Sequence, residues 1–235
     1  MKRNYFLWSV GFVLVFILSA CADSATPTAP VTATNTPTPT RPAVVFPTAA
    51  PGWKIFKRAA YQLALPDSWQ EIQLHADEIK NAVAAAQVNN PPLAETLRAL
   101  LETEQYKGLD FYAVDKSATP RPRTISIARA ALPPNQNIAS IAAAYAETLP
   151  QAVRGAQVTK TQAPFQLNAL NVAAFEYTLS FVDANAKLVT LRGAQYLYVL
   201  DTGAAYLVTI TGDAADATLS ELARSIAATF AATAP

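Results

Sequence analysis

Residues 22–51 are the part of this chain that most restricts what it can fold into. The segment reads ADSATPTAPVTATNTPTPTRPAVVFPTAAP and holds seven prolines and eight threonines, with one acidic and one basic residue. Proline fixes φ and removes a backbone donor, and a segment with so few large apolar residues cannot make a packed core. We expect an extended tether of up to about 3.1 Å per residue, either a stalk or a disordered spacer. The folded domain must therefore lie in residues 52–235.

The first 21 residues, MKRNYFLWSVGFVLVFILSAC, have the layout of an export signal. A basic start is followed by an apolar stretch from Tyr5 to Ala20. As a helix this stretch spans roughly 24 Å, less than the roughly 30 Å hydrocarbon core of a bilayer. This disfavours a permanent transmembrane helix without excluding it, and the sequence predicts a signal peptide over residues 1–20.

The tetrad Leu18-Ser19-Ala20-Cys21 resembles the lipobox of bacterial lipoproteins. In that family the cysteine thiol receives a diacylglyceryl group, with acyl chains such as palmitate, and the peptide bond before the cysteine is cut. The resemblance implies that Cys21 begins the mature chain, so that residues 21–51 are the lipidated cysteine and its tether. Two or three acyl chains make a stable anchor, which predicts a location on the outer face of the cell membrane. The alternative is an inert cysteine in an uncleaved anchor.

Composition excludes several classes of protein. Removal of Lys2 and Arg3 with the signal peptide leaves 16 of the 18 basic residues, against 17 acidic ones. This nearly neutral charge lacks the excess of basic residues that is typical of nucleic-acid-binding proteins. One cysteine rules out an internal disulfide framework, and one histidine rules out zinc sites built on two or three histidines. Seven scattered glycines leave no phosphate-binding loop. We expect no cofactor and no metal.

Residues 52–235 show the periodicities of an α+β domain. Two short strands and a third alternating segment come first, then a strand pair around the loop KSATPRPR, and finally an antiparallel meander with turns at Asp183-Ala184-Asn185 and Asp201-Thr202-Gly203. The predicted strands are 53–58, 61–65, 69–74, 109–115, 124–130, 158–163, 172–182, 188–200 and 205–211.

Helical spacing accounts for the remaining segments. We expect a helix over 77–88 capped by Asp77, and a second that Asn90 caps and Gly108 closes. A third helix buries one face of apolar residues, and the last opens with the capping box Thr218-x-x-Glu221. The predicted buried faces are Leu93, Leu97, Leu100 and Leu101 in the second helix, Ile138, Ile141, Tyr145 and Leu149 in the third, and Leu219, Leu222, Ile226 and Phe230 in the last.

The phrases FKRAAYQLALPDSWQEI and VTLRGAQYLYVLDTGAAYLVTITG and the closing helix resemble PsbP, the extrinsic protein of the oxygen-evolving photosystem, and its bacterial lipoprotein relatives. The resemblance covers most of residues 52–235. It implies an antiparallel β-sheet covered by helices, a PsbP-like α/β/α sandwich. The chain departs from photosynthetic PsbP in its lipobox and Thr-Pro segment, and it has no set of metal-binding histidines to carry over.

Three groups of residues have the chemistry of a site but a simpler interpretation. Asp201-Thr202-Gly203 spells the aspartic-protease triplet, yet the 32 residues after it leave no room for the second half of such an enzyme, which favours a hairpin turn with positive φ at Gly203. His75 is expected at a strand end or on the surface. Arg121 and Arg123 are expected to be solvated loop charges, with a basic patch as the alternative.

Five aromatic residues could form an apolar surface for a ligand or partner: Tyr177, Phe181, Tyr196, Tyr198 and Tyr206. They alternate between a helix-covered face and the opposite face of the sheet, and on a covered face they are core. The sequence does not decide between core and groove.

Together these observations predict a lipid-anchored extracytoplasmic protein, monomeric, acting as a non-catalytic binding or accessory module for an envelope protein or an apolar ligand. No residue is singled out as catalytic. The alternatives are an extracytoplasmic hydrolase with a carboxylate site that spacing does not reveal, and a passive envelope protein.

Overall fold

The computed structural model describes residues 50–117, 121–132, 137–183, 186–200 and 203–233. The expected signal peptide, Cys21, nearly all of the tether and Asp201 lie outside these residues.

A seven-stranded antiparallel sheet in the order β3-β4-β5-β9-β8-β7-β6 is the centre of the domain. The expected strand pair and meander are both confirmed, and β5 pairs with β9 to join them into one sheet. The strands are β3 (Trp69–Glu71), β4 (Leu109–Asp115), β5 (Arg123–Ala131), β6 (Ala156–Leu167), β7 (Leu170–Val182), β8 (Leu188–Val199) and β9 (Ala204–Asp213).

A second, smaller sheet has the order β1-β2-β10. The hairpin of β1 (Trp53–Lys57) and β2 (Tyr61–Pro66) was expected, but β10 (Ala231–Ala232) was not. Two alanines after a helix carry no strand pattern, and only the position of β2 beside them creates the pairing. The N-terminal and C-terminal ends of the domain are therefore held together by backbone hydrogen bonds.

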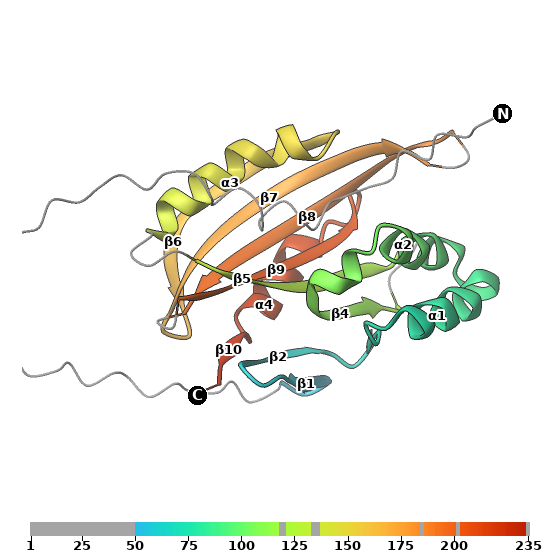
Figure 1. Ribbon diagram of the computed structural model, residues 1–235, viewed down its shortest axis with the longest axis horizontal. Helices are drawn as coiled ribbons and strands as arrows, with labels where there is room; N and C mark the ends of the chain where they lie inside the picture. Colours follow the sequence, from blue (N-terminus) through green and yellow to red (C-terminus); the bar gives the residue numbers. More distant parts are fainter. Residues whose placement is uncertain (1–49, 118–120, 133–136, 184–185, 201–202, 234–235) are drawn as a thin grey trace, which may run out of the picture.

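Register assigns the helices to the two faces of the large sheet. The row Tyr112, Ser126, Thr209, Gln195, Phe175 crosses five strands on one face, with α1 (Ala76–Asn89) and α2 (Pro91–Glu102) packed at its Tyr112 end. Helix α3 (Ile138–Ala152) packs at the Phe175 end (Figure 1). The opposite face packs against α4 (Leu219–Ala227) and the small sheet. The expected α+β fold, an antiparallel sheet covered by helices, is confirmed.

The ends of two helices differ from the sequence prediction. Asn90 does cap α2, since its Oδ1 accepts from Leu93 N at 3.2 Å. Asp77 is not a cap, because α1 begins one residue earlier and the Asp77 carboxylate binds Lys80 at 2.9 Å within the first turn. Gly108 does not close α2, which ends at Glu102; the left-handed residue after it is Glu104 (φ 55°), and Gly108 ends the short 3₁₀ helix η3 (Gln105–Gly108).

The expected capping box of α4 does not form. The Thr218 side chain makes no cap hydrogen bond to the helix. Its hydroxyl instead donates to Asp216 Oδ1 at 2.8 Å and accepts from Arg123 Nη2 at 2.8 Å. The pattern predicted the helix correctly but assigned its threonine to the wrong partner.

Gly193 leaves space for the ring of a tyrosine on the neighbouring strand. A Cβ placed on this residue would lie 2.3 Å from Cζ of Tyr177, whose ring occupies the space above the glycine. Tyr177 is 1% exposed, and its hydroxyl shares a 3.1 Å hydrogen bond with Thr211 on β9. The missing side chain therefore lets a tyrosine from β7 reach across β8.

We expect Gly193→Ala to lower the free energy of unfolding by about 1–3 kcal/mol, because the buried Tyr177 ring must move. Urea denaturation of the purified protein measures this. Gly212→Ala is the matched control, since the nearest atoms to its Cβ would be Leu219 Cδ1 at 3.2 Å and Arg123 Cγ at 3.3 Å, which need to move by only a few tenths of an ångström. Equal effects of the two substitutions would contradict the argument.

Candidate binding surface

The five aromatic residues do not form one surface. Tyr196, Tyr198 and Tyr206 pack into the core beneath α4, while Tyr177 and Phe181 point to the α3 side. The four tyrosines are at most 7% exposed and Phe181 is half-buried. The four tyrosines are therefore core residues and do not line a groove, which are the two interpretations that the sequence left open. Burial raises the pKa of Tyr196 to about 12, so this phenol stays neutral near pH 7.

The α3 side of the large sheet has a central part where the side chains are only partly covered. Four hydroxyl residues on β5 and β9 are half-buried there, between α3 at one end of the sheet and α1 with α2 at the other (Figure 1). We call this set the hydroxyl strip: Thr124, Ser126, Thr209 and Thr211. On both strands the hydroxyl residues alternate with isoleucines, Ile125 and Ile210, that are fully buried on the opposite face.

This alternation is visible in the sequence as Thr-Ile-Ser at 124–126 and Thr-Ile-Thr at 209–211. Period two predicts that the two hydroxyls of each segment share one face of their strand and that the isoleucine between them lies on the other face. The pairing of β5 with β9, which brings Ser126 opposite Thr209, depends on tertiary structure. Sequence reasoning directed at aromatic residues missed this set.

Buried polar side chains border the hydroxyl strip. Gln195 Nε2 donates to Thr209 Oγ1 at 3.2 Å, and Tyr177 bonds Thr211. Burial raises the pKa of Tyr145 and of Tyr177, although hydrogen bonds from Gln195 and Thr211 respectively oppose the rise. Both phenols are therefore neutral hydrogen-bonding groups at physiological pH, not acids or bases.

Gln195 is the residue of this surface whose hydrogen bonding is incomplete. Its side chain is 1% exposed, and its Oε1 atom has no partner among the described residues. A buried carbonyl oxygen without a donor costs about 1–3 kcal/mol. Because this oxygen is itself buried, the groups that the strip offers to a ligand are its half-buried hydroxyls, which are uncharged and can both donate and accept.

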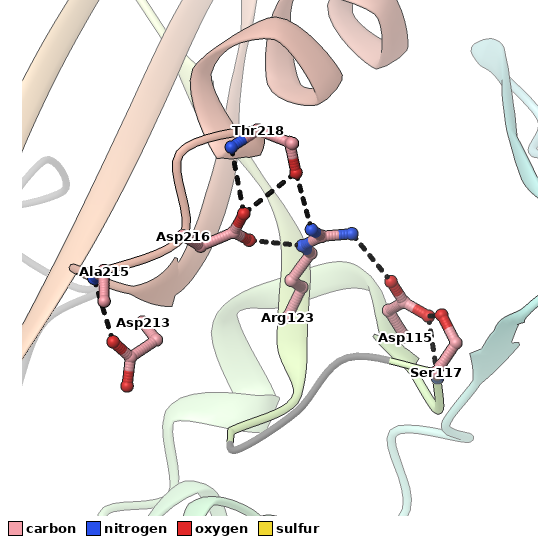
Figure 2. A network of polar contacts seen from close by, with 7 residues as sticks. All are labelled: Asp115, Ser117, Arg123, Asp213, Ala215, Asp216 and Thr218. Carbon is pink, nitrogen blue, oxygen red and sulfur yellow. Dashed lines mark hydrogen bonds and ion pairs between the residues drawn. The ribbon is translucent and has the colours of Figure 1, made fainter.

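A separate polar network joins the sheet to the start of α4 (Figure 2). Arg123 Nε donates to Asp216 Oδ2 at 2.6 Å, and its Nη1 lies 3.3 Å from Asp115 Oδ2. The Asp115 side chain is only 2% exposed and that of Arg123 21%. Asp115 also accepts from both the backbone N and the hydroxyl of Ser117.

The network corrects the expectation that the arginines of the KSATPRPR loop are solvated. Arg123 is the first residue of β5, so alternation along the strand directs it toward α4. Arg121 lies 3.9 Å from Asp183 of the β7–β8 hairpin, with its side chain 22% exposed. Neither arginine contributes to an open basic patch, because each has a carboxylate partner.

Hydrogen bonding from Arg123 lowers the pKa of Asp216, against a smaller opposing effect of burial. A second ion pair also ties α4 to the sheet: Arg192 donates to Glu176 at 2.8 Å, and Ser220 of α4 donates to the same carboxylate at 3.1 Å. Burial would raise the pKa of Glu176, but the hydrogen bonds from Arg192 and Ser220 outweigh it and the pKa is lowered. Both carboxylates are therefore ionised partners of arginine that position α4.

The other residues with site chemistry are dispersed. His75 is exposed and directly precedes α1, at the surface position that was expected. Gly203 has φ +79° and donates to Leu200 O, which fits the expected hairpin turn, while Asp201 itself is outside the described residues. Within the part of the chain that the structure describes, no cluster of three histidine, cysteine or acidic residues could hold a metal ion. The same part contains no helix of the length and apolarity needed to cross a bilayer.

Comparison with solved structures identifies the architecture. The solution structure of cyanobacterial PsbP (CyanoP) from Synechocystis sp. PCC 6803 superimposes with a TM-score of 0.51 at 11% identity, covering 79% of this chain and 95% of that one. The domain has the PsbP fold. LpqN of Mycobacterium tuberculosis, described as involved in cell envelope biogenesis, matches at TM-score 0.44 and 16% identity over 74% of this chain and 83% of its own. The Ran-binding protein Mog1p of Saccharomyces cerevisiae matches at TM-score 0.43 and 10% identity over 76% and 94%.

At these identities the comparison establishes the PsbP fold and nothing of function. No family model matches the sequence, and no curated protein does.

We expect Asp216→Asn to lower the free energy of unfolding by about 1–2 kcal/mol at neutral pH, because the ion pair with Arg123 is lost. A carboxylate whose pKa is lowered by folding stabilises the fold above its ordinary pKa of about 3.9, and this contribution disappears as the pH falls through the lowered value. The difference between the two proteins should therefore shrink toward zero in acid. Urea denaturation at a series of pH values measures it.

Asp213→Asn is the control for this experiment. Asp213 Oδ1 only accepts from Ala215 N at 2.9 Å, a hydrogen bond that an asparagine oxygen can also accept (Figure 2). A constant difference between wild type and Asp216→Asn at all pH values would mean that the ion pair with Arg123 is not what Asp216 contributes.

Proposed function

We propose that this chain is a lipid-anchored extracytoplasmic protein whose PsbP-fold domain is a non-catalytic binding or accessory module. The lipobox-like tetrad ending at Cys21 supports the anchor, and the Thr-Pro segment supports a tether between anchor and domain. The hydroxyl strip carries the binding part of the proposal.

The strip supports binding because its side chains are partly exposed and uncharged. Its four hydroxyls are half-buried, and Gln195 beside them has an unpartnered carbonyl oxygen. Because hydroxyls both donate and accept, such a surface suits an uncharged polar group that exchanges hydrogen bonds with it. The ionised carboxylates Asp216 and Glu176 are engaged by arginines on the opposite face, where they hold α4.

Cys21 is expected to carry diacylglycerol and to begin the mature chain. Intact-mass analysis of the membrane fraction should show the loss of residues 1–20 together with a lipid increment. Cys21→Ala should abolish both changes. A full-length chain without lipid, recovered from the membrane fraction, would exclude the anchor.

Binding at the strip is tested by placing a photo-crosslinking amino acid at Ser126 in the full chain in its native envelope. We expect a discrete crosslinked product from position 126 and none from Ser225, an exposed serine of α4 on the opposite side of the large sheet. Ser126→Ala should weaken capture about two- to tenfold, the effect of one hydrogen bond, with little change in stability. Ser225→Ala should leave capture unchanged.

A hydrolase screen on the same purified protein separates the remaining alternatives. Turnover that survives repurification and disappears when one carboxylate is neutralised would favour the extracytoplasmic hydrolase. The absence of both a crosslinked product and turnover would favour a passive envelope protein.

A further inference from the structure

The end of the β7–β8 hairpin exposes two large aliphatic side chains. Val182 is 63% exposed and Leu188 67%, and the two residues face each other as the last pair of the hairpin. The neighbouring strand β9 ends at Asp213, opposite Leu191, so β7 and β8 continue beyond it. Half-buried Phe181 precedes Val182. We call Val182 and Leu188 the hairpin tip.

The β4–β5 connection lies at the same end of the large sheet as the hairpin tip. This connection begins beside β3, where Ser68 accepts from Lys116 N at 3.2 Å. Lys116 follows β4, in the connection that carries Arg121 to within 3.9 Å of Asp183 beside the tip. The ion pair of Arg121 with Asp183 thus places part of the β4–β5 connection beside the hairpin tip.

Two exposed lysines belong to the same end. Lys187 directly precedes Leu188, and Lys116 begins the β4–β5 connection. The acidic side chain nearest to the tip, Asp183, has its side chain only 9% exposed and lies beside Arg121. Aliphatic side chains next to exposed lysines are the combination that favours a lipid interface with anionic headgroups.

We propose that the hairpin tip contacts the lipid surface to which the chain is anchored, with Val182 and Leu188 in the interfacial layer and Lys116 and Lys187 at the headgroups. This inference rests on the proposed anchor at Cys21. Two side chains are too few for a stable interface with another protein, which needs about 1,000 Å² of buried surface. They suffice for a lipid contact, because an anchored domain already has a high effective concentration at the membrane.

The test measures the polarity of the environment of the hairpin tip in the full chain. Cys21 is the one cysteine of the sequence, and a lipidated thiol cannot be labelled. Val182→Cys therefore takes a single environment-sensitive nitrobenzoxadiazole label after reconstitution into vesicles of phosphatidylethanolamine and phosphatidylglycerol. Gln166→Cys is the matched control, because Gln166 is exposed near the opposite end of the sheet, paired with Asn171.

We expect a blue shift of the label emission, and quenching by a lipid-attached quencher, at position 182 and not at position 166. No shift at 182 in a chain whose intact mass includes the lipid would overturn the contact and leave the anchor standing, and equal shifts at both positions would also overturn it. If the intact mass shows no lipid, the proposed anchor at Cys21 is wrong. The contact of the hairpin tip with lipid is then tested separately: Cys21→Ser chains labelled at position 182 are mixed with the vesicles, and the same blue shift is measured. A shift seen in native envelope but absent from pure lipid vesicles would overturn the lipid contact in favour of a protein partner.

Discussion

Phe230 makes the contact on which the arrangement of this domain depends. Its ring stacks on Tyr198 of β8 at 4.2 Å between centroids and on Tyr61 of β2 at 5.2 Å, just after α4 ends. The Tyr198 hydroxyl donates to Ala227 O at 2.7 Å, which holds the last residue of α4 against the large sheet. One aromatic side chain therefore joins the two sheets and the final helix, and the pairing of β10 with β2 follows directly after it. Stacked rings contribute about 0.5–1.5 kcal/mol beyond the area that they bury.

The two faces of the large sheet have different roles because they are covered to different extents. On the α4 side, the aromatic cluster and the small sheet exclude water, and the ion pairs of Arg123 and Glu176 hold α4 at the edge of this core. On the other side, α3 and the α1–α2 pair pack at opposite ends and leave the hydroxyls of β5 and β9 half-buried between them. Removal of water from one face supplies stability, whereas the partly covered face retains groups that can bind.

Charge is used in this domain mainly to position elements. Arg123 connects the end of β4, the start of β5 and the turn before α4, through two carboxylates that are far apart in sequence. Arg58 bonds Glu71 at 2.6 Å and lies 4.9 Å above the Phe111 ring, which fixes the small sheet against the large one. These arginines suit the task because a guanidinium presents several donors in a plane.

The sequence by itself determined the order and type of every element except η3 and β10, since period two and helical spacing record which side of each segment is buried. It located the Asn90 cap, the meander and the buried stripe of α3 for that reason. Tertiary structure alone decided which elements and side chains become partners. It brings Arg123 to Asp216, 93 positions away, and pairs Ala231–Ala232 with β2. It also buries the tyrosines in the core and leaves the hydroxyls of β5 and β9 between two helical layers. Periodicity is a local property of one segment. The partner of a segment depends on how the chain brings distant residues together, and the spacing of residues within the segment does not encode that partner.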